Sequence, residues 1–171
     1  MIENENILLR APELEDLDQL FLWENDASVR LLSNAHTPVS RFSLEQYILS
    51  AKQDIYEAKQ ARFMAVEKKQ DRLIGHIDLF DFDPHHRRAG VGIMVIDSYR
   101  IKGYAAAMLQ LIINYCAAEL EMHQLFCNIA ANNQASLRLF TKAGFAVCGE
   151  KKEWLRYNKT WINEYILQHF L

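Results

Sequence analysis

The sequence predicts a mixed α/β fold, in which a single, mostly antiparallel sheet is flanked by helices. From residue 62 to residue 96 the hydrophobic pattern repeats every two residues and is interrupted by polar turns, which is typical of consecutive antiparallel strands. An apolar helical stretch from 103 to about 121 then leads directly into an apolar strand, which makes one central parallel β-α-β crossover. The 171 residues contain only 6 Gly and 3 Pro and no linker, so we expect a single domain over 1–171.

The N-terminal part is expected to contain one strand and two helices. A strand over 7–10 ends before Pro12, and acidic residues at 13–16 begin a helix, where the helix dipole favours negative charge. A loop is expected around 33–38. Ser43 followed by Gln46 has the spacing of a capping box, so a second helix is expected to start there and to continue to about residue 60.

The remaining strands follow from alternation and from turn residues. Period-two alternation places His76, Asp78, Phe80 and Phe82 on one face of their strand. A short helix over 133–142 is expected to end at Gly144, and a turn near Asn158 separates the last two strands. The expected strands in this part of the chain are 63–67, 73–82, 88–96, 125–130, 145–155 and 161–170.

Composition excludes several classes of protein. The net charge of −3 argues against a nucleic-acid partner, which requires a basic face, and no apolar run reaches the ~20 residues of a membrane span. The N-terminus lacks the features of a signal peptide. Three scattered cysteines, Cys116, Cys127 and Cys148, predict no disulfide scaffold and no metal site, and they suit the reducing cytoplasm. We expect Cys116 and Cys127 to be buried rather than nucleophilic.

The segment around residue 100 has the features of an anion site. A strand runs into a turn and then into a helix that begins with Gly103 and Ala105. Helix N-termini carry unpaired N–H groups and partial positive charge, and Arg100 and Lys102 flank this point. The alternative is an ordinary helix start with solvated basic residues. The patterns of a Walker loop and of a dinucleotide fingerprint are absent from the sequence.

Two motifs in this order resemble those of one family. Arg100-x-x-Gly103-x-Ala105 resembles the acetyl-CoA loop of the GNAT N-acetyltransferases. The segment from Asn133 through Ser136, Phe140 and Lys142 to Gly144-Phe145 is similar to a second motif of that family. The order of the expected elements also matches from end to end. Within the superfamily, 73–79 and 86–89 look most like the spermidine/spermine acetyltransferases, and the ribosomal-protein N-terminal acetyltransferases share much of the pattern.

The resemblance implies acetyl-CoA as cosubstrate and no metal. The backbone of one strand end would pair with the pantetheine arm, although these residues also suit a core strand. Asn133 would contact CoA, unless it only caps its helix, and Lys142 would approach the phosphates, unless it is only solvated. The strand end comprises Met94, Val95 and Ile96, and the implied pyrophosphate loop comprises Arg100, Ile101, Lys102, Gly103, Tyr104, Ala105 and Ala106.

The resemblance also suggests how amine acetylation would proceed. The N–H of Val95 would polarise the thioester carbonyl. Asp78 matches an acidic position of the polyamine-acetylating relatives and would bind the amine, while His76 would pass its proton to water; both also suit structural roles. The family's Tyr, which protonates the departing thiolate, is replaced here by Phe140. Another hydroxyl (Tyr104 or Ser136) or water would then act, or the protein is weakly active.

The function implied by the resemblance is therefore acetyl transfer from acetyl-CoA to a primary amine such as spermidine. Two alternatives stay open at this point. The first is acetylation of a protein α-amine, as in the ribosomal-protein relatives, and the second is a non-catalytic module that binds acyl-CoA. Because family members are often dimers, the resemblance also implies a homo-oligomer. The expected binding partner is the acceptor, either a small amine or a peptide N-terminus.

Overall fold

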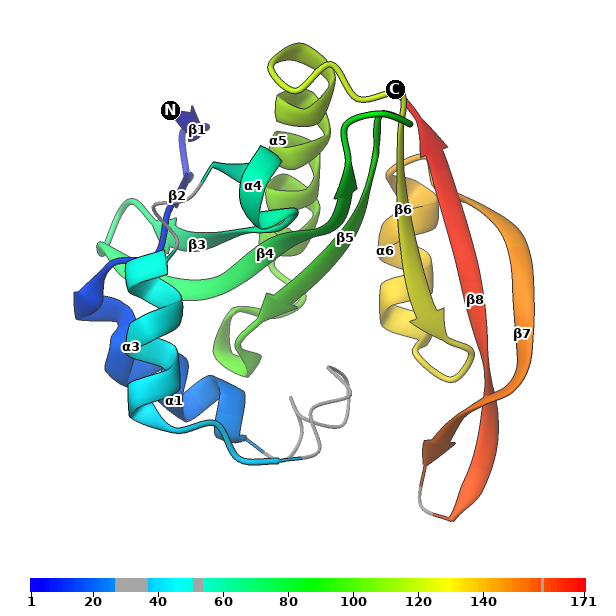
Figure 1. Cartoon of the computed structure of the whole chain (residues 1–171), viewed down its shortest axis with the longest axis horizontal. Helices are drawn as coiled ribbons and strands as arrows, with labels where there is room; N and C mark the ends of the chain where they lie inside the picture. The colour runs from blue at the N-terminus through cyan, green and yellow to red at the C-terminus, as the bar shows by residue number, and fades with distance from the viewer. Residues whose placement is uncertain (27–36, 51–53, 158) are drawn as a thin grey trace.

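The computed structural model describes residues 1–26, 37–50, 54–157 and 159–171, and within them eight strands form one mixed sheet (Figure 1). The sheet order is β1-β2-β3-β4-β5-β6-β8-β7. The elements are β1 (Ile2–Glu3), β2 (Ile7–Arg10), the 3-10 turn η1 (Leu14–Asp16), α1 (Leu17–Asn25), α3 (Arg41–Ser50), α4 (Ile55–Ala58), β3 (Ala61–Glu67), β4 (Arg72–Asp83), β5 (Arg88–Val95), η2 (Asp97–Tyr99), α5 (Tyr104–Ala118), β6 (Gln124–Ala130), α6 (Gln134–Lys142), β7 (Ala146–Tyr157) and β8 (Thr160–Phe170).

The predicted fold class is confirmed. Strands β1 to β5 pair antiparallel in sequence order, and β5 and β6 form the parallel pair of the sheet, joined by α5. Strands β6, β8 and β7 continue antiparallel. The two-residue strand β1 was not expected from the sequence, because a run this short carries no periodicity.

Helices cover both faces of the sheet and create two cores. Helices α5 and α6 lie behind the sheet in Figure 1, whereas α1 and α3 lie in front of β3 and β4. Burial of each large side chain of α5 stabilises the fold by about 1.5–3 kcal/mol. The buried residues of α5 are Met108, Leu109, Ile112, Ile113 and Cys116. The smaller core in front contains Leu20, Trp23, Leu44, Ile48 and Met64.

The second predicted helix is wrong in two respects. It begins at Arg41 rather than at Ser43, because the hydroxyl of Ser40 accepts the N–H of Ser43 at 3.0 Å and so caps the helix. It does not run on to residue 60 either, since Asp54 is extended and its carboxylate caps α4 through the N–H of Tyr56. Residues 51–53, and most of the loop expected at 33–38, lie outside the described residues.

The predicted face of β4 is correct for three of its four side chains. His76, Asp78 and Phe80 share the front face, but Phe82 is buried in the core behind the sheet. Asp81 takes a left-handed conformation, with φ of +48°, and the register with β5 shifts between Phe80 and Asp83. This bulge adds one residue and reverses the alternation beyond it.

The C-terminal hairpin has a regular strand and an irregular one. The register between β7 and β8 shifts between Val147 and Gly149 and again between Lys151 and Leu155. Strand β7 lies at the end of the sheet order and therefore forms one of its edges. Gly144, with φ of +95°, follows the last residues of α6, as predicted. The turn expected near Asn158 lies where that residue is not described.

Gly75 allows β4 and β5 to approach closely. A Cβ at this position would lie 2.0 Å from the carbonyl oxygen of Met94, which belongs to the backbone of β5. We expect Gly75→Ala to lower the free energy of unfolding by about 3 kcal/mol, because strand backbone must shift. Urea unfolding measures this loss.

The control is Gly149→Ala in β7, where a Cβ would meet nothing within 4 Å. We expect this variant to stay within about 0.5 kcal/mol of the wild type. Equal losses in the two variants would contradict the assigned close approach of β4 and β5.

Candidate functional site

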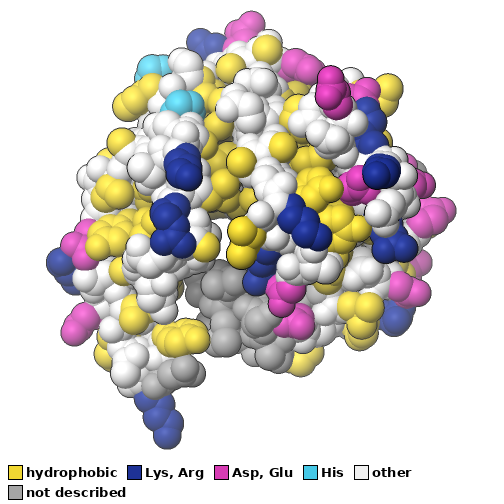
Figure 2. Space-filling model, turned by 180° about the vertical axis from the view of Figure 1, so that it is seen from behind, with side chains coloured by type: hydrophobic (Ala, Val, Ile, Leu, Met, Phe, Trp, Pro, Cys, Tyr) yellow, Lys and Arg dark blue, Asp and Glu magenta, His cyan; other side chains and the backbone are white. Residues whose placement is uncertain are grey.

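The parallel strands β5 and β6 separate after a short contact. They pair only over Arg88–Gly90 and Gln124–Phe126, whereas β5 continues to Val95. Figure 1 shows the two strands diverging from this point. The view from behind shows a hollow between the two halves of the molecule, with Lys and Arg side chains on both sides of it (Figure 2). Among the described residues, the divergence therefore leaves one edge of β5 without a neighbouring strand.

The unpaired edge of β5 presents particular backbone groups. The N–H of Ile96 donates to the carbonyl of Ile74 at 3.0 Å, so it faces β4. Because backbone groups alternate along a strand, those of Met94 also face β4, while those of Ile93 and Val95 face the gap. The Val95 carbonyl accepts a hydrogen bond from Nε of Arg100 at 2.9 Å. Its N–H is therefore the Val95 backbone group available to a ligand.

The loop before α5 lies at the end of this edge. Gly103 has φ of +85°, and a Cβ there would have nothing within 4 Å, so the approach to its backbone is open. The N–H groups of Tyr104, Ala105 and Ala106 begin the helix and have no partner one turn earlier. Lys102 and Ala106 are exposed, whereas Tyr104 packs against the ring of Tyr99, edge to face at 5.6 Å.

Ile101 is the strained residue of the loop. Its φ is +61°, which is rare for a β-branched residue, and its side chain is fully exposed. Strain of this kind costs about 1–3 kcal/mol, and burial of the side chain does not compensate it here. Such conformations gather at ligand-binding loops, which agrees with the role expected for residues 100–106.

The residues expected from the second motif lie on and around α6. Asn133 caps α6, because its Oδ1 accepts the N–H of Ser136 at 3.1 Å, which leaves its Nδ2 to meet a ligand. Lys142 is exposed at the other end of the helix. Phe140 is buried and packs edge to face on Phe145, with ring centroids 5.0 Å apart. It therefore belongs to the core.

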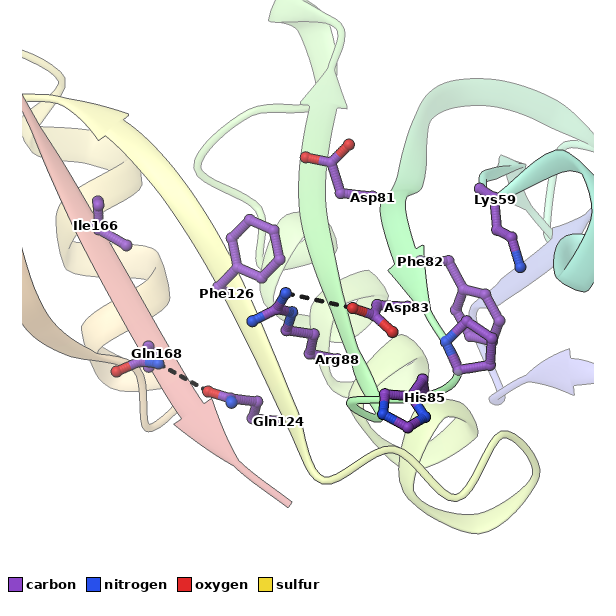
Figure 3. Close-up of a pocket in the computed structure, with 11 residues that line it drawn as sticks. Lys59, Asp81, Phe82, Asp83, His85, Arg88, Gln124, Phe126, Ile166 and Gln168 are labelled. Carbon is purple, nitrogen blue, oxygen red and sulfur yellow. Dashed lines mark hydrogen bonds and ion pairs between the residues drawn. The ribbon is translucent and has the colours of Figure 1, made fainter.

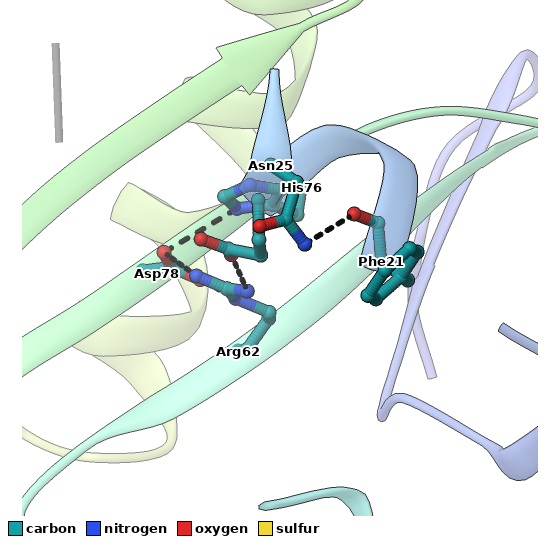
Figure 4. A network of polar contacts seen from close by, with 6 residues as sticks. Phe21, Asn25, Arg62, His76 and Asp78 are labelled. Atoms are coloured by element: carbon teal, nitrogen blue, oxygen red, sulfur yellow. Dashed lines mark hydrogen bonds and ion pairs between the residues drawn. The ribbon is translucent and has the colours of Figure 1, made fainter. Parts of the chain in front are cut away.

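The front face of the sheet carries a cluster of charged residues around Asp78 (Figure 4). Arg62 of β3 lies opposite Asp78 in the register of β3 and β4. Its Nε and Nη2 donate to the two carboxylate oxygens of Asp78 at 2.8 and 2.9 Å. Its Nη1 donates to Glu24 of α1 at 2.5 Å. One guanidinium thus joins two strands and a helix.

The electrostatics of this cluster keep its members charged. Burial by itself would raise the pKa of the Asp78 carboxyl, but the neighbouring His76 and the Arg62 guanidinium outweigh burial and hold that pKa well below its usual range. Burial would lower the pKa of Arg62, and the carboxylates of Asp78 and Glu24 instead raise it. In this cluster the two carboxylates of Asp78 and Glu24 share the one guanidinium of Arg62.

His76 lies beside Asp78, towards the interior. It is only 7% exposed, and its ring lies near that of Trp23, with centroids 6.2 Å apart. Its Nδ1 is 3.3 Å from Oδ2 of Asp78, close enough for an ion pair. The geometry of this contact is not that of a hydrogen bond, so Nδ1 of His76 has no hydrogen-bond partner among the described residues.

A cavity opens onto the charged cluster. It has a volume of about 330 Å³, and its lining includes Glu24, Tyr47, Arg62, Asp78 and Phe80. In the register of the sheet, Asp78 also lies opposite Gly92 of β5. A Cβ on Gly92 would meet only the ring of Phe80, at 3.8 Å, so β5 places no side chain between Asp78 and the gap.

A larger cavity, of about 800 Å³, lies at the other end of the sheet (Figure 3). Its walls come from the turn between β4 and β5 and from β6 and β8. In its wall Arg88 and Asp83 form an ion pair at 3.3 Å, and Gln168 donates to Gln124 at 2.8 Å. None of the site residues expected from the sequence lines this cavity, so the smaller one is the candidate site.

Sequence reasoning missed two members of the charged cluster. Counting back from the turn at 68–71 would have placed Asp78 opposite residue 61 or 62, so the pairing with Arg62 had a local signal. A register shift between Ala65 and Val66 selects 62. Glu24 had no such signal, because it meets Arg62 only through the packing of α1 on the sheet.

The cysteines behave as expected. Cys116 and Cys127 are buried, and burial raises the pKa of each thiol to about 12, whereas Cys148 is exposed. We therefore expect one thiol to react with an aromatic disulfide reagent in the native protein and all three to react after denaturation. Rapid labelling of a second thiol in the native protein would contradict this assignment.

The strain at Ile101 predicts a stabilising substitution. Because asparagine tolerates a left-handed conformation, we expect Ile101→Asn to raise the free energy of unfolding by about 1 kcal/mol. This corresponds to a rise in Tm of about 2–4 °C, measured by calorimetry.

The control is Val147→Asn, which makes a comparable replacement at an exposed residue of β7. We expect it to lower Tm, because Val147 is paired in an extended strand that favours β-branched residues. A similar loss of Tm in Ile101→Asn would argue that the loop is unstrained.

Two absences among the described residues bear on the site. No group of three or more His, Cys, Asp or Glu side chains among them could hold a metal ion. No helix within the described ranges is long and apolar enough to cross a membrane.

Comparisons with known proteins agree with this arrangement. A family model described as an acetyltransferase (GNAT) domain matches residues 6–146. The chain is 28% identical over 149 residues to the SPbeta prophage-derived uncharacterized N-acetyltransferase YokL of Bacillus subtilis (strain 168), covering 87% of this chain and 81% of that protein. It is 29% identical over 145 residues to the spermidine N(1)-acetyltransferase of Escherichia coli (strain K12), covering 85% and 75%.

The fold is that of a solved acetyltransferase. The crystal structure of spermidine N-acetyltransferase from Vibrio cholerae, in complex with CoA and spermine, superposes with a TM-score of 0.88. The match covers 98% of this chain and 96% of that one, at 22% identity. The family model, the relatives and the fold agree, and the chain therefore belongs to the GNAT family of N-acetyltransferases.

Proposed function

We propose that the protein transfers an acetyl group from acetyl-CoA to a primary amine, with a polyamine such as spermidine as acceptor. The divergence of β5 from β6 carries this proposal, because it opens a backbone edge beside the start of α5. The acidic cavity on the other face of the sheet supports a cationic acceptor. The spermidine-acetylating relative of Escherichia coli supports the same substrate class.

The donor would lie along the free edge of β5. The pantetheine arm resembles a peptide and would pair with the backbone groups that face the gap, as an added strand does. The pyrophosphate would meet the N–H groups at the start of α5, where the helix dipole favours negative charge. Lys102 and Lys142 are exposed and would approach the phosphates, and Asn133 would contact the arm through Nδ2.

The reaction is the aminolysis of a thioester. The neutral amine nitrogen forms a bond to the carbonyl carbon, the C–S bond breaks, and the amine proton ends on the departing sulfur, giving an amide and free CoA. The N–H of Val95 would stabilise the negative charge that develops on the carbonyl oxygen. Asp78 would bind the acceptor on the front face, with Gly92 as the open side.

The departing sulfur needs a proton from a group other than residue 140. Phe140 has no hydroxyl and is buried. A thiol has a pKa near 8.5, so its thiolate is a good leaving group and water is a sufficient proton donor. Tyr104, in the first turn of α5, is the protein hydroxyl that we propose for the same step.

An acceptor assay tests the proposed reaction. We expect CoA to be released from acetyl-CoA when spermidine or spermine is present. With substrate in excess and Cys148 blocked beforehand, a thiol reagent measures the free thiol of the released CoA. Turnover of peptides with a free α-amine, without turnover of polyamines, would contradict the substrate. Tight binding of acetyl-CoA without any turnover would contradict the enzymatic role itself.

The pyrophosphate loop is tested by Gly103→Val. The variant places a branched side chain at φ of +85°, where the backbone must be approached closely. We expect the affinity for CoA, measured by calorimetry, to fall by about ten-fold or more, which is 1.4 kcal/mol. The control, Gly149→Val, should bind CoA normally, and normal binding by Gly103→Val would contradict the assignment of the loop.

A further inference from the structure

We infer that Arg62 is a positioning residue of the acceptor site, which fixes Asp78 as a permanent anion that anchors an ammonium group and does not act as the base. The inference rests on the proposed function, since it assumes that the acceptor binds at Asp78. It follows from the contacts that surround the carboxylate, taken one side at a time.

Arg62 grips Asp78 through both of its oxygens. Nε and Nη2 donate to Oδ1 and Oδ2 at 2.8 and 2.9 Å, which is the paired geometry in which a guanidinium binds a carboxylate most strongly. The two bonds fix the plane of the carboxylate. They use one lone pair on each oxygen, and a carboxylate has about four acceptor sites, so it can still accept hydrogen bonds from a ligand.

Arg62 is itself held in place by the opposite side of the cavity. Its Nη1 donates to Glu24 of α1 at 2.5 Å, and its guanidinium carbon lies 5.6 Å from the centre of the Tyr47 ring on α3. The side chain is only 16% exposed. The fork therefore cannot turn away from Asp78 without breaking a contact to another element.

Asp78 is left open on the side that faces β5. Arg62 occupies the side of β3, and His76 lies on the same strand with Nδ1 at 3.3 Å. On the side of β5, the cross-strand neighbour is Gly92, which has no side chain. The carboxylate is about a quarter exposed, so a ligand can reach it.

The charges around Asp78 make it an unsuitable base. The groups that face it are Arg62 from β3, His76 from β4, Glu24 from α1 and Tyr47 from α3. A general base works best when its pKa lies near the operating pH, and that of Asp78 is held well below its usual range. A proton from the amine would not stay on it.

An ionised carboxylate also favours the charged form of the amine that it holds. The ammonium anchored by Asp78 is therefore the one that does not react, and the attacking nitrogen is a different amino group of the same acceptor. This requirement selects molecules with at least two amino groups. It also separates an anchoring role for Asp78 from a role in removing the proton.

The test is Arg62→Met, assayed with spermidine and with octylamine, a monoamine that is one chain atom shorter. We expect KM for spermidine to rise about ten-fold or more with little change in kcat, and the preference for spermidine over octylamine to fall by a similar factor. We also expect an added loss of kcat/KM at acidic pH, because Asp78 without Arg62 becomes protonated at a higher pH.

Arg10→Met is the matched control. Arg10 makes the same two-pronged contact with Asp16, at 2.7 and 2.9 Å, but outside the site. It should lower stability without changing the pH profile or the preference between the two amines. If Arg62→Met behaves as Arg10→Met does, Arg62 is merely structural and the inference is overturned.

Arg62→Lys covers the case in which Arg62→Met does not fold. It keeps the positive charge but loses the two-pronged contact. The preference for spermidine over octylamine should therefore be lower than in the wild type and in Arg10→Met, but should not be lost completely. Wild-type preference in a folded Arg62→Lys variant, together with an unchanged pH profile, would count against the positioning role.

A measurement without turnover separates the inference from the proposed function. If the wild type binds CoA but acetylates no amine, the proposed function fails. Carbon NMR of the Asp78 carboxyl as a function of pH still tests Arg62 in that case. We expect the pKa of Asp78 to rise clearly in Arg62→Lys, and an unchanged titration would overturn the inference.

Discussion

The short parallel contact between β5 and β6 is the constraint on which the site depends. Three residues of each strand pair, and beyond them the two strands separate. A backbone N–H that loses its strand partner must find water or a ligand, because burying it without a partner is costly. The gap therefore has to remain accessible. The connection from β5 through η2 brings the start of α5 to the same place, so strand edge and helix end face one opening.

The two faces of the sheet have different roles. Behind it, the side chains of β5 belong to the main core, which fixes the strand while its backbone stays available. In front, glycines at 90 and 92 leave the middle of β5 without side chains, whereas Met94 packs against the smaller core, and the ring of Phe80 fills the space over Gly90. The space over Gly92 is not filled in this way, and it adjoins Asp78. Because Gly92 has no side chain, the space beside the charged cluster stays open on the side of β5.

Local sequence patterns predicted most of the helices and strands, whereas the features that were missed depend on long-range packing. Alternation located β3 to β5, and the apolar stretch before β6 located α5, because both signals lie within a few residues. The reversal at Asp81 was not visible, since many residues can take one left-handed conformation in a strand without a compositional mark. The contact of Glu24 with Arg62 spans 38 residues and depends on how α1 crosses the sheet, which no local pattern encodes.

The irregular strand β7 has a consequence for how the protein behaves at high concentration. A straight outer strand offers a regular row of free N–H and C=O groups on which another chain can add, and this is a common route to aggregation. In β7 that row is broken twice by register shifts, and Lys151 and Lys152 lie at the second break. The opposite edge, β1, is only two residues long. Neither edge strand is therefore a good template for the addition of another chain, so the sheet can keep two open edges without polymerising.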